Sequence, residues 1–291
     1  MKETFLVFVY GTLRRHERNH FLLKKAKNIA KQCWSTGILY DTGCDYPVMT
    51  PHNSRRVYGE LYEVNQAQLK SLDFLEGYTG NERTNNYDRI LQTVYTDKET
   101  VEALVYVQST TKIGNLNEIK YGDWKCQKYL AQQELLYFAY GSCMDDERFC
   151  LSGVQEQFKD VKGCGIAANY SLAYTRNSLD GGKADLVESD EYVEGKVYRI
   201  KNEALPYLFK REGVAFSIYR PAFLDVCIDS VIYQDVLTFL VVDKVEEVAP
   251  SEYYVTQILR GAKGFVSEVY YKKLQDDLNK RFETTKNFYK P

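Results

Sequence analysis

Short apolar runs alternate with turn residues along this chain, and most of the runs have the Tyr- and Val-rich composition of β-strands. The first run, residues 5–9, ends where a glycine-containing turn begins. The other runs of this kind cover residues 58–64, 90–95, 101–107, 135–139, 193–200 and 236–242. The pattern therefore predicts a fold in which strands dominate.

Leucines at helical spacing mark the helices, which are fewer. After Asn65, which suits a helix N-cap, Leu69, Leu72 and Leu75 fall on one face. Gly77 suits the left-handed residue at the end of this helix. Residues 202–213 repeat the same plan, so we expect a second helix of this type there.

Two more helices are expected near the end of the chain, with no clear counterpart in the first half. Ser251 and Ser267 stand at their starts, and apolar residues follow at helical spacing. These residues are Tyr254, Ile258 and Leu259 in the first helix, which Gly261 ends, and Tyr270, Leu274, Leu278 and Phe282 in the second.

The pattern occurs twice along the chain. In each half an apolar strand runs into a turn of Tyr, Gly and a hydroxyl residue, and a leucine-rich helix later ends in Glu-Gly. The turns are Tyr10-Gly11-Thr12 and Tyr140-Gly141-Ser142, and the helix ends are Glu76-Gly77 and Glu212-Gly213. Gly59 and Gly195 open strands that precede these glutamates by the same interval. Because solenoid repeats are only about 20–50 residues long, this spacing indicates two copies of one fold.

The length of the chain agrees with two domains. Its 291 residues are about twice a usual single domain, so each half is long enough to bury its own core. A polar stretch, residues 122–133, separates the last strand of the first copy from the first strand of the second. We therefore expect domains at 1–132 and 133–291.

The cysteines and histidines exclude several kinds of site. The seven cysteines form an odd set without a Cys-x-x-Cys pair, which speaks against a disulfide framework or a cysteine-rich zinc site. All three histidines lie in the first half, so the second domain has no histidine for a catalytic triad or a metal. Chemistry shared by the two halves must use other groups, and no metal site is expected.

Charge and hydropathy bear on partners and location. A net charge of −2 and a pI near 6.0 give no electrostatic reason to expect nucleic acid. The apolar run at the start of the chain is too short for a signal peptide or a membrane span. We expect a cytoplasmic protein that binds neither nucleic acid nor membrane, as a monomer or a weak homo-oligomer.

The repeated turns are candidate substrate-binding elements. A strand that stops in Tyr-Gly-Thr or Tyr-Gly-Ser can expose consecutive backbone N–H groups, which form a concave site for a carboxylate. Glycine allows the bend and a close approach. The candidate residues are Tyr10, Gly11, Thr12 and Leu13 in the first copy, and Tyr140, Gly141, Ser142 and Cys143 in the second. The alternative is that these turns merely end strands, which is common for a single tripeptide but less so for a repeated one.

Glu76 and Glu212 are the candidate catalytic residues. They are the acids common to both copies at the helix end, where the helix dipole disfavours negative charge and pushes the carboxylate pKa upward. A raised pKa suits a general base that later acts as an acid. The alternative is a solvated glutamate in the last helical turn, which the matched interval in the two halves disfavours.

Several motifs together resemble the γ-glutamylcyclotransferase-like family. The first half looks like the γ-glutamylamine cyclotransferase branch, through the 10–15 turn segment, Asn19-His20 and residues 59–62, 72–78 and 87–89. The second half is closer to the branch that acts on free γ-glutamyl amino acids, through residues 137–142, 181–185, 211–214, 250–254 and 258–262. It departs from that branch at Cys143, where the branch usually has Asn, and at residues 264–266, where it usually has Gly-Leu-Pro.

The resemblance implies an α+β protein of two tandem domains, each a small mixed β-barrel of six strands with flanking helices. It also implies a cofactor-free γ-glutamylcyclotransferase, of acyltransferase or amine-lyase type, that releases 5-oxoproline and a free amine or amino acid from a small γ-glutamyl compound. In this interpretation the turns hold the γ-glutamyl group, and Glu76 and Glu212 transfer protons between the attacking and departing amines.

Other residues carry less weight. Tyr254 suits closure of the second pocket, but a tyrosine at helical spacing is more often a core residue. Arg89 and Arg220 follow the two glutamates and suit pairing with them, with substrate or with structural partners. His16 and His20 are expected on the surface or as capping residues. Thiol catalysis by Cys143 is disfavoured, because the first copy has leucine at that position and no histidine accompanies the cysteine.

Two other functions stay open at this stage. One is a non-catalytic tandem module that binds or senses γ-glutamyl metabolites. The other is a different acyl-transfer or amide-cleaving enzyme, because fold and site type do not fix the substrate. Cyclisation yields 5-oxoproline whereas hydrolysis yields glutamate, so product identity separates the enzymes.

Overall fold

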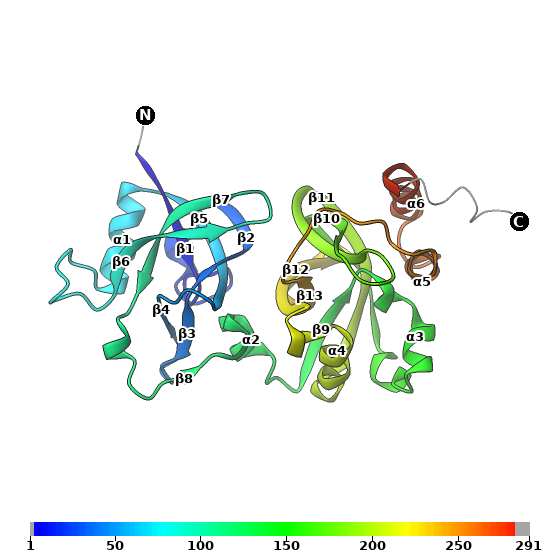
Figure 1. The fold of residues 1–291 in the computed structure, drawn as a ribbon, viewed down its shortest axis with the longest axis horizontal. Coiled ribbons are helices and arrows are strands. Elements are labelled where there is room, and N and C mark those ends of the chain that lie inside the picture. Colours follow the sequence, from blue (N-terminus) through cyan, green and yellow to red (C-terminus); the bar gives the residue numbers. More distant parts are fainter. Residues whose placement is uncertain (1–2, 283–291) are drawn as a thin grey trace, which may run out of the picture. The chain divides into compact units, whose positions relative to one another are not determined.

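Both halves of the chain fold around a closed barrel of five strands (Figure 1). In a computed structural model, which describes residues 3–282, the chain divides into two units, Met1–Lys128 and Tyr129–Pro291. The strand order in the first barrel is β1-β5-β2-β6-β7, with β1 antiparallel to β5 and parallel to β7. The predicted mixed β-barrels are confirmed.

The first unit also contains a small sheet and two α-helices. The barrel strands are β1 (Thr4–Val9), β2 (Lys27–Thr36), β5 (Arg56–Asn65), β6 (Asp88–Tyr95) and β7 (Thr100–Val107). The small sheet, in the order β4-β3-β8, consists of β3 (Ile38–Asp41), β4 (Pro47–Thr50) and β8 (Asn117–Glu118). The helices are α1 (Gln66–Glu76) and α2 (Trp124–Tyr129), with 3₁₀ turns η1 (His20–Leu23), η2 (Thr110–Lys112) and η3 (Lys120–Gly122).

The second unit repeats the barrel. Starting from β9, its cyclic order is β9-β11-β10-β12-β13, which matches the first barrel strand for strand. The strands are β9 (Glu134–Ala139), β10 (Val161–Arg176), β11 (Lys183–Lys201), β12 (Tyr219–Ile228) and β13 (Val231–Val241). The helices are α3 (Asp146–Leu151), α4 (Leu205–Arg211), α5 (Glu252–Ala262) and α6 (Glu268–Phe282), with 3₁₀ turns η4 (Ser142–Met144), η5 (Gln155–Phe158), η6 (Asn202–Ala204) and η7 (Val214–Phe216). The duplication inferred from the motifs is therefore a duplication of topology.

The expectation of six strands in each barrel is wrong. Each closed barrel has five, since β3 and β4 of the first unit pair with each other outside the barrel. In the second unit β10 and β11 are instead long strands of 16 and 19 residues that pair along most of their length.

Two glycines bring the central strand of each barrel close to the strand that leads into the turn. A Cβ at Gly59 would lie 2.3 Å from the carbonyl oxygen of Val9, and a Cβ at Gly195 would lie 2.3 Å from that of Ala139. A side chain of any size at either position would push the two strands apart. The glycines that fixed the register of the repeat in the sequence therefore also hold the end of β1 and of β9 in place.

The helix before Glu76 forms as its sequence predicts. The Asn65 side chain accepts from the backbone N–H of Gln68, and the Gln68 side chain accepts from that of Asn65, which completes a capping box. Leu69 and Leu72 are buried against the barrel, but Leu75 on the same face is 38% exposed. The end of α1 thus leaves the core and reaches a pocket.

Candidate active site

The turn after β1 lines a pocket of about 170 Å³ in the first unit. The N–H of Arg14 donates to the carbonyl of Gly11 over 3.0 Å, whereas the N–H groups of Gly11, Thr12 and Leu13 have no hydrogen-bond partner within residues 3–282. Gly11 packs on Pro47, where a Cβ would lie 2.7 Å from the proline Cγ. Three neighbouring free N–H groups beside a pocket are suited to holding a carboxylate.

The turn after β9 has the same hydrogen-bond pattern. The N–H of Met144 donates to the carbonyl of Gly141 over 3.0 Å. The N–H groups of Gly141, Ser142 and Cys143 have no hydrogen-bond partner in the part of the chain that the structure describes. All eight turn residues predicted from the sequence thus lie in two equivalent turns.

The tyrosine at the start of each turn anchors it to the parallel strand. The hydroxyl of Tyr10 donates to the backbone carbonyl of Tyr106 in β7 over 2.7 Å. In the second unit the hydroxyl of Tyr140 donates to the backbone carbonyl of Phe239 in β13. Burial holds the pKa of both phenols well above the ordinary value. These tyrosines therefore stay neutral donors and position the turns.

Glu76, the last residue of α1, lines the same pocket as the first turn. Within the described residues its carboxylate has no hydrogen bond or ion pair. Burial raises its pKa to about 7. The upward direction agrees with the sequence argument, but the cause is desolvation rather than the helix dipole.

Glu212 occupies the corresponding place in the second unit. It follows α4 directly, and Gly213 behind it is left-handed with φ 62°, as Gly77 is after Glu76 with φ 64°. Burial raises the pKa of Glu212, and the nearby charge of Arg211 and the thiol of Cys143 oppose this only in part. The Cys143 Sγ lies 3.6 Å from Glu212 Oε1, so this glutamate and its turn are in direct contact.

A tyrosine follows each glutamate at the same point of the repeat. The backbone N–H of Tyr87 donates to the carbonyl of Glu76, and that of Tyr219 donates to the carbonyl of Glu212, each over 3.2 Å. Tyr87 lines the first pocket. The sequence alone does not show that Tyr87 and Tyr219 are equivalent positions of the repeat. The loops between each glutamate and its tyrosine differ in length, so the two tyrosines do not align by interval.

Two side chains near Glu212 lie outside the predicted site. Tyr254 of α5 accepts from the backbone N–H of Ala184 over 3.2 Å, and burial raises its pKa to about 12. A Cβ on Gly141 would lie 3.4 Å from its hydroxyl, which places Tyr254 at the turn rather than in the core. Arg211 donates from Nε to Cys143 Sγ and from Nη2 to Ser142 Oγ, both over 2.9 Å.

The two arginines considered from the sequence have other hydrogen-bond partners than the glutamates. Arg89 forms an ion pair with Asp73 over 2.6 Å, and the Tyr106 hydroxyl donates to the same carboxylate over 2.7 Å. Arg220 is buried and donates to the carbonyl of Pro221. For Arg89 the structural interpretation is therefore correct.

Asn19 and His20 both contact residues of the first turn. The Asn19 side chain donates to Thr12 Oγ1 over 3.0 Å, and His20 Nδ1 lies 3.1 Å from the carbonyl of Leu13. His20 is half-buried, and this contact is with the turn rather than with a helix end.

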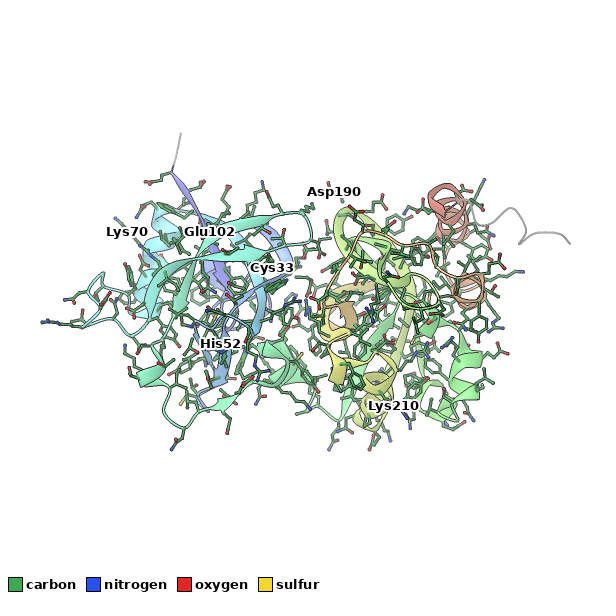
Figure 2. The ribbon with its side chains drawn as sticks, viewed as in Figure 1. Cys33, His52, Lys70, Glu102, Asp190 and Lys210 are labelled. Carbon is green, nitrogen blue, oxygen red and sulfur yellow. The ribbon has the colours of Figure 1, made fainter. Side chains whose placement is uncertain are left out.

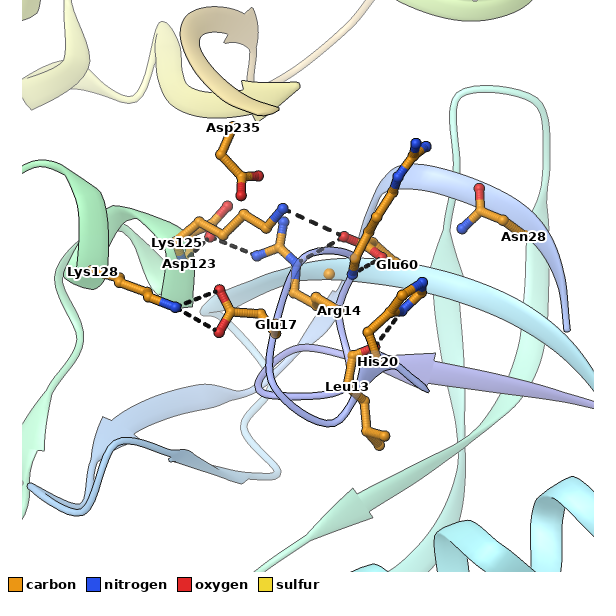
Figure 3. A network of polar contacts seen from close by, with 12 residues as sticks. Leu13, Arg14, Glu17, His20, Asn28, Glu60, Asp123, Lys125, Lys128 and Asp235 are labelled. Carbon is orange, nitrogen blue, oxygen red and sulfur yellow. Dashed lines mark hydrogen bonds and ion pairs between the residues drawn. The ribbon is translucent and has the colours of Figure 1, made fainter. Parts of the chain in front are cut away.

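A buried cluster of charges lies beneath the first turn (Figure 3). The Arg14 guanidinium contacts Glu60 Oε1 at 3.3 Å and Asp123 Oδ1 at 2.7 Å, and all three side chains are at most 5% exposed. Glu60 Oε2 also accepts from the backbone N–H of Arg15 and from the Tyr62 hydroxyl. Burial by itself would raise the pKa of Glu60. The charge of Lys125, whose Nζ lies 3.9 Å from Glu60 Oε1, and that of Arg14 act with these bonds to hold the pKa below its ordinary value, so the turn rests on a permanent carboxylate.

The second unit has the opposite charge at this place. Lys196, which corresponds to Glu60, donates to the Asp146 carboxylate over 3.1 Å, and the Tyr198 hydroxyl donates to the carbonyl of Cys143. The two turns are thus supported at equivalent points by different ion pairs.

The described residues include neither a candidate metal site nor a helix that could span a membrane. No group of three or more His, Cys, Asp and Glu side chains within residues 3–282 could hold a metal ion. Over the same residues, no helix is both long and apolar enough to cross a membrane.

Comparison with known proteins gives matches to both units. A family model described as "Gamma-glutamyl cyclotransferase, AIG2-like" matches residues 7–126, and one described as "AIG2-like family" matches residues 192–274. "Putative gamma-glutamylcyclotransferase YkqA" of Bacillus subtilis (strain 168) is 38% identical, over 94% of this chain and 97% of that protein. The crystal structure of YkqA superposes with a TM-score of 0.85, over 95% of this chain and 98% of that one.

A second relative matches only part of the chain. It is the "Gamma-L-glutamyl-butirosin B gamma-glutamyl cyclotransferase" of Niallia circulans, 38% identical over 120 residues, which are 41% of this chain and 74% of that protein.

Proposed function

The chain belongs to the gamma-glutamyl cyclotransferase, AIG2-like family, and on that premise we propose that it converts γ-glutamyl compounds to 5-oxoproline with release of an amine. One observation carries the proposal. In each unit a glutamate with a raised pKa lies at a turn that has three free backbone N–H groups. A carboxylate-binding turn and a proton-transfer group are what this reaction requires.

The turn binds the γ-glutamyl group, which carries a carboxylate and an amine on the same carbon. Once N–H groups hold the α-carboxylate, the chain of the substrate can fold until the α-amine nitrogen lies about 3–3.5 Å from the γ-carbonyl carbon. Ring closure is then intramolecular, and well-aligned reactions of this kind reach effective molarities of about 10⁵–10⁸ M. Positioning therefore supplies much of the rate.

Glu76 and Glu212 move the proton. The carboxylate takes a proton from the α-amine as its nitrogen forms a bond to the γ-carbon, and donates it to the departing amine as the old carbon–nitrogen bond breaks. No oxidant, reductant or cofactor is consumed in this sequence. A remaining turn N–H stabilises the negative charge that develops on the γ-carbonyl oxygen.

Product identity in ¹⁸O-labelled water tests this reaction. γ-Glutamyl amino acids, γ-glutamyl amines and glutathione are incubated with the wild type, and products are identified by mass spectrometry. We expect unlabelled 5-oxoproline, because cyclisation adds no water. Glutamate carrying ¹⁸O would instead establish a hydrolase, and calorimetric binding without any product would establish a binding module.

A further inference from the structure

The two glutamates that we propose as proton-transfer groups have different charged neighbours. In the described chain the Glu76 carboxylate has no hydrogen bond or ion pair, and the residue before it is Leu75. Glu212 instead follows Arg211, whose Nε lies 3.8 Å from Glu212 Oε1, and both of these side chains are 16% exposed. One carboxylate is therefore paired with a cation and the other is not.

Arg211 also reaches Glu212 through the thiol of Cys143. Arg211 Nε donates to Cys143 Sγ over 2.9 Å, and the thiol donates to Glu212 Oε1 over 3.6 Å. Burial raises the pKa of this thiol, so the thiol stays a neutral donor near neutral pH. Leu13, at the corresponding position of the first turn, has no donor on its side chain.

The other titratable groups around Glu212 leave this difference in place. Arg148 of α3 adds a second positive charge. Phenols from β9, from the turn after it, from β12 and from α5 interact with Glu212, and burial raises the pKa of each, so they stay neutral where a carboxylate titrates. These phenols belong to Tyr137, Tyr140, Tyr219 and Tyr254.

Around Glu76 the interacting groups are neutral phenols. Tyr10 and Tyr87 interact with this carboxylate, and burial raises the pKa of both. Arg18 lines the same pocket, but it pairs with Asp45 over 3.3 Å at the surface, where water screens its charge. Burial alone therefore raises the pKa of Glu76, to about 7.

From these contacts we propose that Arg211 is a positioning residue of the second site, which holds Glu212 in the ionised form that accepts the proton. The inference rests on the proposed function and concerns the pH range of each site. An opposite charge within about 4–6 Å favours the charged form of a carboxyl group and lowers its pKa by about 1–3. The second site therefore stays active in acid in which Glu76 is already protonated.

The test measures pH profiles of kcat/KM with the first site silenced by Glu76→Gln. The substrate is γ-glutamyl-alanine or γ-glutamyl-ethylamide, whichever gives 5-oxoproline, and the profiles are compared with and without Arg211→Leu. We expect Arg211→Leu to move the midpoint of the acidic limb upward by about one pH unit, because the charge that favours ionised Glu212 is lost. The α-amine of the substrate is the same in both proteins and does not contribute to this shift. A midpoint that stays in place overturns the inference.

Arg211→Lys separates the charge of Arg211 from its support of the turn. Lysine keeps the positive charge but lacks the planar fork that reaches Ser142 and Cys143 together. We expect Arg211→Lys to restore most of the shift in midpoint. If Arg211 only supported the turn, both variants would lower kcat/KM over the whole profile and leave the midpoint unchanged, which would overturn the inference.

Lys210 provides the matched control. It is exposed and lies one residue before Arg211 (Figure 2). Lys210→Leu removes the same charge at the surface, where salt and water screen it, so the midpoint should move by less than about 0.3 pH unit. A shift as large as that for Arg211→Leu would mean that overall charge, and not Arg211, acts on Glu212, and would overturn the inference.

The reciprocal change decides the question if the Arg211 variants do not fold. With the second site silenced by Glu212→Gln, Leu75→Arg should move the acidic midpoint of the first site downward by about one pH unit, because it supplies the missing cation. An unchanged midpoint, with 5-oxoproline still formed, overturns the inference and leaves the proposed function standing.

Absence of 5-oxoproline from the wild type would instead refute the proposed function. In that case the titration of Glu212 is followed directly by ¹³C NMR of the glutamate carboxyl carbons, with Glu212→Gln to assign the signal. A midpoint that Arg211→Leu raises retains Arg211 as the residue that keeps Glu212 ionised, and an unchanged midpoint ends the inference.

Discussion

At the scale of single residues, the proposed chemistry depends on two carboxyl groups that are costly to ionise. Within residues 3–282 the Glu76 carboxylate has no hydrogen bond or ion pair. Glu212 has the Cys143 thiol and the Arg211 guanidinium beside it, and the charge of Arg148 also acts on its pKa. Burial therefore raises the pKa of each. Glu76, whose pKa is about 7, therefore exchanges protons near neutral pH, which an ordinary surface glutamate does not.

The first prediction concerns the pH dependence of the first site. In Glu212→Gln protein, kcat/KM for 5-oxoproline formation should fall about tenfold per pH unit below about 7, because Glu76 must be ionised to accept a proton. The measurement is a pH profile between about 5 and 9. A flat acidic limb would show that Glu76 is not the base.

The second prediction concerns stability. Folding raises the pKa of Glu76 from 4.5 to about 7, so the folded state binds more protons and the free energy of unfolding falls as pH rises through this window. Glu76→Gln removes the ionisable group, so the free energy of unfolding of the variant does not fall in this way. The variant should equal wild type near pH 4 and exceed it by roughly 1–3 kcal/mol at about pH 8.

Tryptophan fluorescence is the suitable readout, because Trp34 and Trp124, the two tryptophans of the chain, both belong to the first unit. Urea unfolding at the two pH values gives the difference. Glu82→Gln, in an exposed loop of the same unit, is the control. A Glu76→Gln protein without added stability at the higher pH would contradict the buried position of this carboxyl.

At the scale of elements, each turn is held by charges that other strands and loops supply. In the first unit the turn after β1 is tied to β5 through Glu60 and to the segment before α2 through Asp123. In the second unit the support comes from Lys196 of β11 and Asp146 of α3. The turn that we propose as the carboxylate site is thus held in place by its surroundings as well as by its own residues.

The third prediction tests this support. Arg14→Met places in the first turn the residue that the second turn has at position 144. It removes the cation that Glu60 and Asp123 share, while Lys125 stays 3.9 Å from Glu60. Loss of one partner from a buried ion pair costs about 3–5 kcal/mol. Urea unfolding followed by tryptophan fluorescence should show this loss.

Arg55→Met is the control for that change. Arg55 pairs with Glu118 at the surface, where both side chains are well exposed, so its loss should cost no more than about 1 kcal/mol. Equal destabilisation by the two substitutions would mean that the cluster beneath the turn contributes little.

The sequence predicted these elements unevenly. Strands such as β1, β5, β6, β7, β9 and β13 were found because their apolar residues form continuous runs. β2, β10 and β12 were missed, since lysine, glutamine, glycine or proline interrupts the apolar pattern that periodicity detects. In the closed barrel the backbone N–H and C=O groups of these strands pair with neighbouring strands. This pairing leaves no local pattern in the sequence.

For the candidate site, the residues that occur in both halves were predicted from the sequence, and the residues that occur in one half were not. The turns and both glutamates were predicted because they occur twice at one interval. Arg211 and Tyr254 have no matching residue in the first half, so repetition could not reveal them. The ion cluster beneath the first turn joins positions 14, 60 and 123, which lie far apart in the sequence.

At the scale of the whole molecule, the chain has two complete candidate sites of one family on two barrels of the same topology. They differ at particular positions, among them Leu13 against Cys143, Glu60 against Lys196 and Leu75 against Arg211. We propose 1–132 and 133–291 as the limits of the two domains, so that the second begins just before β9. Two sites that each retain the turn and the glutamate should act independently.

The most direct test measures 5-oxoproline release by wild type, Glu76→Gln, Glu212→Gln and the double variant, with Glu82→Gln and Glu203→Gln as exposed controls. Each catalytic substitution should lower turnover at its own site about 10²–10⁴-fold. The two single variants should retain rates that add to that of wild type, the controls should match wild type, and the double variant should be nearly inactive. Full activity in the double variant would contradict the assignment of Glu76 and Glu212 as the proton-transfer groups of the two sites.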